Sequence, residues 1–404
     1  MKVLQVNTVY GFGSTGKIVA AIQDTCFEQG IDCLASFSYY EKDQRHTEKA
    51  IPVSSWLDTH IHNRLALITM LQGCFSGLRT RLFLRRVKAY APDIIHLHNI
   101  HGSFINHKLL FDYIKRNRIP VIWTLHDCWA FTGYCPHFDM CGCEKWQTQC
   151  VDCPNKHMYP QTLFDFSSLM FKLKKRWFTG VENLTLVTPS QWLADLTRQS
   201  FLKEYPVQVI QNGIDLSVFR PVESDFRARY QIPPEKKIVL GVAFGWGIRK
   251  GLDVFVELAN RLDPSYQIVL VGTDDAVDRE LPTRILSIHR TQNQRELAEI
   301  YTAADVFVNP TREDNFPTVN MEALACGTPV ITFRAGGSPE CVDETCGSVV
   351  SCDNTDSLER EIVRVCRERP FTREACRARA EQFDEKEKFR EYVKLYESKK
   401  GNIV

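Results

Sequence analysis

The sequence predicts an α/β protein built from two doubly wound domains, each with a parallel sheet between layers of helices. Short apolar, β-branched runs alternate with amphipathic helical segments, which is typical of such sheets. The order of strand, glycine-containing loop and helix begins at residue 2 and starts again at residue 236. The 404 residues are enough for two domains with separate cores.

In the first half, we expect a domain over residues 1–203. Its strand segments are short and rich in Ile, Val and Leu, and its helical segments carry apolar residues at spacings of three and four. A polar loop is expected up to about residue 53 and a Cys-rich insertion over about 128–157. Strands are predicted at 2–8, 33–38, 92–99, 119–127 and 183–190, and helices at 17–30, 56–90, 107–118, 163–179 and from 191.

In the second half, we expect a domain over residues 204–382. It begins with a short strand and turn, VQVIQNGID, before the pattern of strand, loop and helix starts again at residue 236. Residues 383–404 should form a C-terminal surface helix that packs back on the first domain. Further strands are predicted from 236, at 266–273, 305–310 and 328–333, and helices at 250–262, 294–303, from Thr318 to Gly327, and from Ser338.

Composition narrows the class of protein. Apolar residues make up 44% and charged residues 25%, as in soluble globular proteins, and the net charge of +1 gives no reason to expect nucleic acid as a partner. The N-terminus enters a strand without the regions of a signal peptide, and no run reaches the roughly 18 apolar residues of a membrane span. We therefore expect a cytoplasmic protein.

Residues 305–340 contain two consecutive strand–loop–helix units. Pro310 and Pro317 interrupt the first strand, Thr318 can cap the helix that follows, and a second helix starts at Ser338. Helix N-termini beyond strand ends suit phosphate. Carboxylates crowd the same stretch and would repel phosphate unless they accept hydrogen bonds from sugar hydroxyls, so a nucleotide-sugar site is predicted. They are Glu313, Asp314, Glu322 and Glu340.

Gly11 to Gly16, GFGSTG, form a loop between the first strand and the first helix. They match G-x-G-x-x-G, but the acidic residue that dinucleotide binding requires has no counterpart near the second strand. They nearly match an ATPase phosphate loop, but Ile18 occupies the position of the Mg²⁺-binding Ser or Thr. The loop is a tight turn or a backbone site for phosphate at Gly13 and Gly16, and we favour the phosphate site.

Charged and imidazole side chains follow several strands. His126 follows the run PVIWTL, where an imidazole can hydrogen-bond a sugar hydroxyl. We interpret His126 as functional and His96 as structural, and both interpretations stay open for His98. Arg249 and Lys250 precede a helix, where positive charge is unfavourable without an anion. They are either a solvated helix end or, as we favour, ligands of a diphosphate.

Five cysteines lie close together in the insertion: Cys135, Cys141, Cys143, Cys150 and Cys153. The set Cys135, Cys143, Cys150 and Cys153 could form a structural zinc site. Disulfides, which a reducing cytosol disfavours, and buried free thiols are the alternatives.

The segment LRTRLFLRRVKAY interleaves basic residues with Leu and Phe. It is either a solvated face or a surface that contacts an anionic membrane or a lipid-phosphate acceptor. The basic residues are Arg79, Arg81, Arg85, Arg86 and Lys88.

Taken together, the motifs resemble the retaining glycosyltransferases of family 4, especially the bacterial exopolysaccharide and colanic-acid type. The resemblance covers nearly the whole chain. It rests on EDNFPTVNMEALACGTPVI with GGSPE, QNGIDLSVFRP, RKGLD, HLHNIHG, and TLHDCWAFTGYC with the Cys-containing segment after it. It implies the GT-B fold, two Rossmann-like domains facing a central cleft, with the acceptor on the first domain and the nucleotide sugar on the second.

The resemblance also implies roles for individual residues. Glu322 matches the family's ribose-binding glutamate. The partner acid that contacts the sugar falls on Asp314, with Glu313 one residue earlier, so the choice between them stays open. Lys250 matches the family's lysine, while the arginine five residues before it falls on Gly245, and Arg249 can substitute.

We therefore expect a hexosyltransferase that moves a sugar from a nucleoside diphosphate to a glycan or lipid-linked acceptor in cell-surface polysaccharide synthesis, with retention of configuration and no required cofactor. A P-loop-like ATPase and a catalytically degenerate sugar-binding protein are the alternatives. Expected catalytic residues are His126, Glu313 and Asp314. Expected donor-binding residues are Gly13, Gly16, Arg249, Lys250, Asn315, Phe316, Pro317, Thr318 and Glu322.

Overall fold

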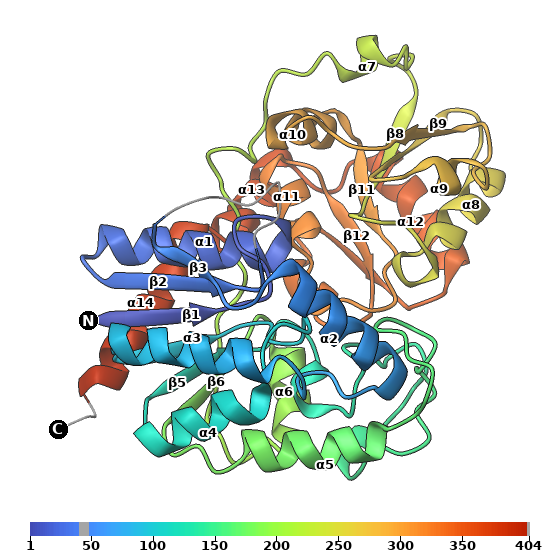
Figure 1. The fold of residues 1–404 in the computed structure, drawn as a ribbon. Helices are drawn as coiled ribbons and strands as arrows, with labels where there is room; N and C mark the ends of the chain where they lie inside the picture. The colour runs from blue at the N-terminus through green and yellow to red at the C-terminus, as the bar shows by residue number, and fades with distance from the viewer. Residues whose placement is uncertain (40–47, 402–404) are drawn as a thin grey trace. The chain divides into compact units, whose positions relative to one another are not determined.

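A computed structural model describes residues 1–39 and 48–401 and divides the chain into two compact units (Figure 1). One comprises Met1–Gln211 with Lys386–Val404, and the other Asn212–Glu385. The first unit extends beyond the expected residue 203 because strand β7 (Val207–Val209) pairs with β6 (Leu184–Thr188). Each unit holds one all-parallel sheet, which confirms the α/β prediction.

The first unit has a seven-stranded sheet in the order β3-β2-β1-β4-β5-β6-β7. The strands β1, β4 and β5 lie in the middle and bring their carboxyl ends together. The loops after these strands include the glycine loop and the histidines. Besides β6 and β7, the strands of this sheet are β1 (Lys2–Val6), β2 (Asp32–Phe37), β3 (Ala50–Pro52), β4 (Ile94–Leu97) and β5 (Val121–Thr124).

Successive strand residues pack on opposite faces of this sheet. Leu4 joins the core under α3, α4, α5 and α6, whereas Val3 joins the core under α1 and α14. This alternation follows from the pleat of a strand. The helices are α1 (Gly13–Glu28), α2 (Trp56–Thr69), α3 (Gly77–Tyr90), α4 (His107–Asn117), α5 (Ser167–Phe178), α6 (Gln191–Gln199) and α14 (Glu385–Gly401).

The expected single helical stretch 56–90 is in fact two helices. Met70, with φ of 58°, ends α2 in the left-handed region. Gly73, with φ of 81°, has no room for a side chain because a Cβ would lie 1.7 Å from the His107 ring. The turn between the helices is thus set by tertiary packing. The expected polar loop before residue 53 includes residues 40–47, which lie outside the described residues, and its end forms the strand β3.

The second unit has a six-stranded sheet in the order β10-β9-β8-β11-β12-β13. Helices α10, α11 and α13 cover one face, and α8 and α12 cover the other. The strands are β8 (Lys237–Val242), β9 (Tyr266–Val271), β10 (Ile285–Ile288), β11 (Val306–Asn309), β12 (Val330–Phe333) and β13 (Gly347–Val350). The helices are α7 (Phe226–Arg229), α8 (Leu252–Arg261), α9 (Asp275–Asp278), α10 (Gln294–Ala303), α11 (Thr318–Ala325), α12 (Thr355–Glu368) and α13 (Arg373–Glu381).

The C-terminal helix α14 packs on the first unit, beside β1 and α1 (Figure 1). Tyr396 is fully buried and its hydroxyl lies 2.7 Å from His96 Nδ1, while His96 Nε2 lies 2.8 Å from Thr124 Oγ1. His96 is therefore structural. The helix buries one aromatic face against the rest of the first unit. None of the helices in the described part of the chain is long and apolar enough to span a membrane.

Candidate active site

The candidate donor site of the second unit lies where three neighbouring strands end. The loops after β8, β11 and β12 carry Arg249 with Lys250, residues 310–317, and the Gly336-Gly337 turn. They are joined by backbone hydrogen bonds from Arg312 N to Arg249 O (2.9 Å) and from Gly337 N to Asp314 O (3.0 Å). The three loops therefore form one structure.

Two glycines permit this close approach. Gly251 has φ of 76° and a Cβ there would lie 2.4 Å from Pro310 O. Gly336 has φ of 56° and a Cβ there would lie 1.9 Å from Asp314 O. Any other residue would push the loop of Asp314 away from its neighbours.

Lys250 and Asp314 form an ion pair in this cluster, with 2.5 Å between Nζ and Oδ2. Their side chains remain 21% and 19% exposed, so both can contact a ligand. Glu313 is more buried, at 5%, and its carbonyl oxygen accepts hydrogen bonds from Arg249 and Thr311. The structure thus places Asp314, rather than Glu313, beside the cation.

Glu322 lies on α11, where the Tyr301 hydroxyl donates a hydrogen bond to its Oε2 at 3.1 Å. Burial and the adjacent Glu322 raise the pKa of Tyr301 well above its usual value, so the phenol stays a donor. The contact fixes one carboxylate oxygen of Glu322.

The start of α11 differs from the prediction. Thr318 is the first helical residue and Pro317 is the N-cap, with no side-chain capping bond. The expected second helix at Ser338 is only a 3₁₀ turn, Ser338–Cys341. Phe316 is 3% exposed and packs edge-to-face against Phe383 in the core, so it supports the loop rather than lining its surface. Asn315 is also buried.

The sequence did not single out Arg312, which braces the donor loops. Its guanidinium donates to Asp253 at 2.8 and 2.7 Å and to Asp353 at 2.7 Å. These carboxylates raise its pKa although burial opposes this, so it stays charged. A buried pair, Asn309 and Asn320, was also missed, although amides within apolar segments are a recognisable signal of a polar network.

In the first unit, the glycine loop precedes α1. Gly11 N donates to Gly16 O at 2.9 Å, and a Cβ on Gly16 would lie 3.1 Å from Val9 Cγ2. Gly13 begins the helix with φ of 63° and has open space where a Cβ would stand. The N-cap, Phe12, makes no side-chain capping bond and the first turn holds no acid. The loop therefore offers backbone N–H groups to an anion.

His98 and His126 follow β4 and β5 and are linked, with 3.1 Å between His98 Nδ1 and His126 Nε2. Burial lowers the pKa of His126 to about 4 and that of His98 well below its usual value. Both rings are neutral at pH 7. His98 Nε2 lies 3.1 Å from Gln5 Oε1, and Gln5 Nε2 donates to Val19 O at 3.0 Å.

These contacts set the tautomers. Since the Gln5 amide nitrogen is the donor to Val19, its oxygen must accept from His98 Nε2–H. His98 Nδ1 then carries the lone pair and accepts from His126 Nε2–H. In neutral His126, Nδ1 is left as the atom that accepts a hydrogen bond.

Asp127 lies beside these histidines and binds His101, at 2.8 Å between Oδ2 and Nε2. Burial alone would raise its pKa, but the charge and hydrogen bond of His101 lower it to about 2. Asp127 also accepts from Trp129 N at 2.8 Å, so it anchors the start of the insertion.

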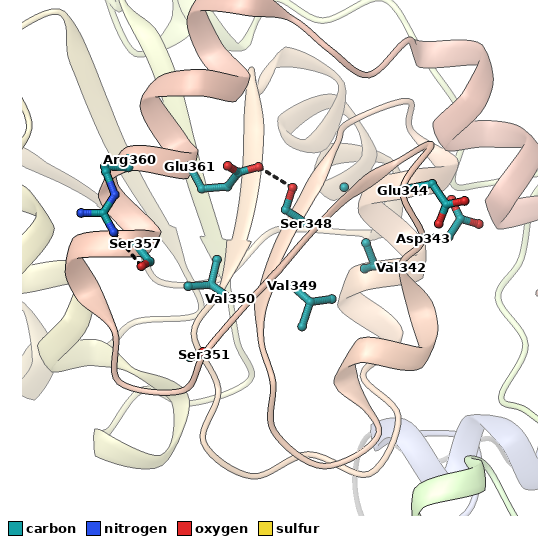
Figure 2. A pocket seen from close by; sticks show the side chains of 11 residues that line it. Val342, Asp343, Glu344, Ser348, Val349, Val350, Ser351, Ser357, Arg360 and Glu361 are labelled. Atoms are coloured by element: carbon teal, nitrogen blue, oxygen red, sulfur yellow. Dashed lines mark hydrogen bonds between the residues drawn. The ribbon is translucent and has the colours of Figure 1, made fainter.

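A hollow of about 670 Å³ lies along the edge strand β13 of the second unit (Figure 2). Ser348 donates to Glu361 there, and Arg360 donates to Ser357. None of the expected donor-binding residues lines it. It is a groove on the outer strand, separate from the loops that hold Lys250 and Asp314.

Comparisons with known proteins match both halves of the chain to glycosyltransferase families. Residues 236–368 match the family described as "Glycosyl transferases group 1", and residues 41–218 match "Glycosyltransferase Family 4". The putative colanic acid biosynthesis glycosyl transferase WcaC of Escherichia coli K12 is 22% identical over 370 residues, 87% of each chain.

Solved structures show the same fold. Sucrose-phosphate synthase from Thermosynechococcus elongatus has a TM-score of 0.73 at 20% identity over 98% of both chains. HepE from Anabaena, in complex with UDP-glucose, has a TM-score of 0.68 at 15% identity, over 98% of this chain and 100% of HepE. These matches confirm the predicted GT-B fold.

Proposed function

Because the chain belongs to the glycosyltransferases of family 4 and group 1, we propose that it transfers a hexose from a nucleoside diphosphate sugar with retention of configuration. The acceptor is a glycan or lipid-linked glycan in cell-surface polysaccharide synthesis. The observation that carries this is the ion pair of Lys250 and Asp314 on joined loops, with Glu322 held by Tyr301 on the helix α11 that follows the Asp314 loop. The names of the relatives, colanic acid synthesis and a UDP-glucose complex, support it.

In the proposed reaction, Lys250 and Arg249 bind the diphosphate of the donor. An ammonium group has three N–H donors, so Lys250 can hold Asp314 and a phosphate oxygen together. The bond between the sugar C1 and the phosphate oxygen breaks as the diphosphate leaves. The acceptor oxygen bonds to C1 on the same face, and its proton passes to the departing phosphate oxygen.

The carboxylates hold the donor by its hydroxyl groups. Glu322 accepts from the ribose and Asp314, the more exposed acid beside Lys250, accepts from the sugar. His126 Nδ1 accepts from a further sugar hydroxyl. Gly13 and Gly16 let a phosphate approach the backbone. The positive charges of Lys250 and Arg249 oppose the charge that develops on the leaving diphosphate, which is electrostatic catalysis.

The donor class is tested by thermal denaturation with a panel of UDP, GDP, ADP and dTDP sugars. We expect one base class to raise the melting temperature, because a ligand at about 100 times its Kd adds about 2.7 kcal/mol to the free energy of unfolding. Glu322→Gln should abolish most of this shift while its amide oxygen still accepts from Tyr301. Glu257→Ala, on the surface of α8, is the control. A full shift in Glu322→Gln would refute the ribose contact.

An exposed apolar stripe on α2 suggests how a lipid-linked acceptor is reached. Leu57, Ile61, Leu65 and Ile68 recur at spacings of three and four and are 37–61% exposed. His62 of α2 contacts Ser76 at the start of the basic helix α3, at 2.8 Å. The exposed basic residues of α3 are Arg79, Arg81, Arg85, Arg86 and Lys88. An apolar stripe next to cationic side chains suits an anionic lipid surface, and we place it at the cytoplasmic face of the membrane.

Membrane contact is tested by sedimentation with vesicles of phosphatidylglycerol or of phosphatidylcholine. We expect binding to the anionic vesicles only, weaker at high salt, and its loss in Leu57→Glu/Ile61→Glu because carboxylates on the stripe are repelled. Phe27→Glu alters an exposed apolar residue of α1 and should leave binding unchanged. Equal binding of the double variant would contradict the assignment.

A further inference from the structure

The chain between β5 and α5 has an unusual construction. It contains only the 3₁₀ turns Trp129–Phe131 and Lys145–Gln147, with no α-helix or strand. Yet Phe138, Trp146 and Cys150 are at most 9% exposed. A loop of this length without regular structure needs another means of fixing its backbone.

Four of its cysteines line the same small cavity. Cys135, Cys143, Cys150 and Cys153 all line a space of about 10 Å³. This is about the volume that one water-sized sphere occupies. These are the same four cysteines that the sequence suggests as ligands, and all are free thiols in the structure.

The thiols already interact, and the backbone around them is fixed. Cys135 is hydrogen-bonded to the Cys153 sulfur, and Gly133 N donates to Cys150 Sγ at 3.1 Å. Lys145 Nζ donates to both carbonyl groups of the Cys150–Cys153 turn, Val151 O and Asp152 O, at 2.9 Å each.

A buried cation next to the cluster provides independent evidence. Lys174 is fully buried and lies 3.6 Å above the Trp129 ring, to whose carbonyl oxygen its Nζ also donates. Burial lowers the pKa of Lys174 to about 7, and negative charge on Asp127, and on Cys150 and Cys135 where their thiols ionise, opposes this lowering. Lysine is rarely buried without a charged partner. Four neutral thiols provide none.

We propose that this cluster binds one structural Zn²⁺ through Cys135, Cys143, Cys150 and Cys153, and that Lys174 balances the resulting negative charge. Four thiols lose four protons on binding, which leaves a tetrathiolate centre with a net charge of −2. The centre is structural because all four positions are filled. Within residues 1–39 and 48–401, Asp275, Asp278 and His289 are the one group of three or more metal-ligating side chains whose ligand atoms lie within 4.8 Å of one another. In this part of the chain, no three of the four cysteine sulfurs lie this close together. The cysteine side chains must therefore turn towards one another when zinc binds.

The test is elemental analysis of the full-length protein, purified from zinc-supplemented cells without a chelator. We expect about one zinc per chain, with four sulfur ligands at about 2.3 Å by X-ray absorption. Cys143→Ser and Cys153→Ser should each lose most of the metal, whereas Cys352→Ser, an exposed thiol of the second unit, should keep it. His289→Ala removes one ligand from the exposed group of Asp275, Asp278 and His289, and this variant should also keep the metal.

Absence of zinc, together with no uptake of added Co²⁺, would overturn the proposal, as would zinc lost in His289→Ala but kept in the cysteine variants. A mass two hydrogens lower per bridge would instead show disulfides. If the cysteine variants fail to fold, the absorption spectrum of the wild-type protein still decides. None of these measurements depends on sugar transfer, so the zinc proposal and the proposed function can fail separately.

Discussion

Replacing Lys250 by alanine is expected to lower kcat for sugar transfer by about 10²–10³-fold, the usual cost of removing one group that stabilises developing charge. The departing diphosphate gains negative charge as the bond to the sugar breaks, and Lys250 is the cation held against Asp314 at 2.5 Å. Without it, the Asp314 carboxylate also loses this ion pair, so its negative charge repels the donor more strongly. The loss should therefore appear in both kcat and the affinity for the nucleoside diphosphate.

Steady-state kinetics and diphosphate titration of Lys250→Ala check this. Lys236→Ala changes a lysine of the same unit whose Nζ donates to Gln267 Oε1, and this variant should keep full activity. The double variant Lys250→Ala/Asp314→Ala should recover part of the lost diphosphate affinity, because the repelling carboxylate is gone. Unchanged kcat in Lys250→Ala would show that the diphosphate binds elsewhere. Equal affinity in the single and double variants would show that Asp314 does not face the donor.

The positions of the site residues could be predicted because they follow from the sheet. Residues after β8 and β11 come together since these strands are neighbours and parallel. That placed Lys250 and Asp314 at one edge from sequence alone. The choice between Glu313 and Asp314 could not be made, because it depends on how the Gly336-Gly337 turn holds the loop, a contact between segments distant in sequence.

Other features escaped prediction for similar reasons. Met70 carries no turn signal, and the break between α2 and α3 is fixed by packing of Gly73 against His107. The strand β3 has only three residues, too few for a periodic pattern. Tertiary contacts decide each of these.

Replacing His126 by alanine is expected to lower kcat by about 10²-fold, the lower end of the range for removing one hydrogen-bonding group that acts in the transition state. The chain of contacts from Gln5 through His98 fixes His126 with its proton on Nε2 and its lone pair on Nδ1. A sugar hydroxyl can then donate to Nδ1. His289→Ala, an exposed histidine of the second unit, is the matched control.

The pH profile distinguishes this role from acid–base catalysis. Burial lowers the pKa of His126 to about 4, so its ring stays neutral from pH 8 down to about pH 5. Activity should show no step near pH 6.5 that His126→Ala removes. In the unfolded chain the ring binds a proton near its ordinary pKa. Its contribution to stability is therefore complete above about pH 6.5 and is lost as the pH falls towards 4, so folding is monitored alongside activity.

His98→Phe separates positioning from contact. It keeps a ring of similar size but removes the acceptor for His126 Nε2–H, so the imidazole can rotate or change tautomer. We expect a loss of 10- to 100-fold in kcat, about the range found for residues that orient metal-binding histidines, with the donor KM little changed. His98→Phe could keep the wild-type kcat while His126→Ala does not. That result would show that His126 Nδ1 accepts its hydrogen bond whether or not Gln5 and His98 hold the proton on Nε2.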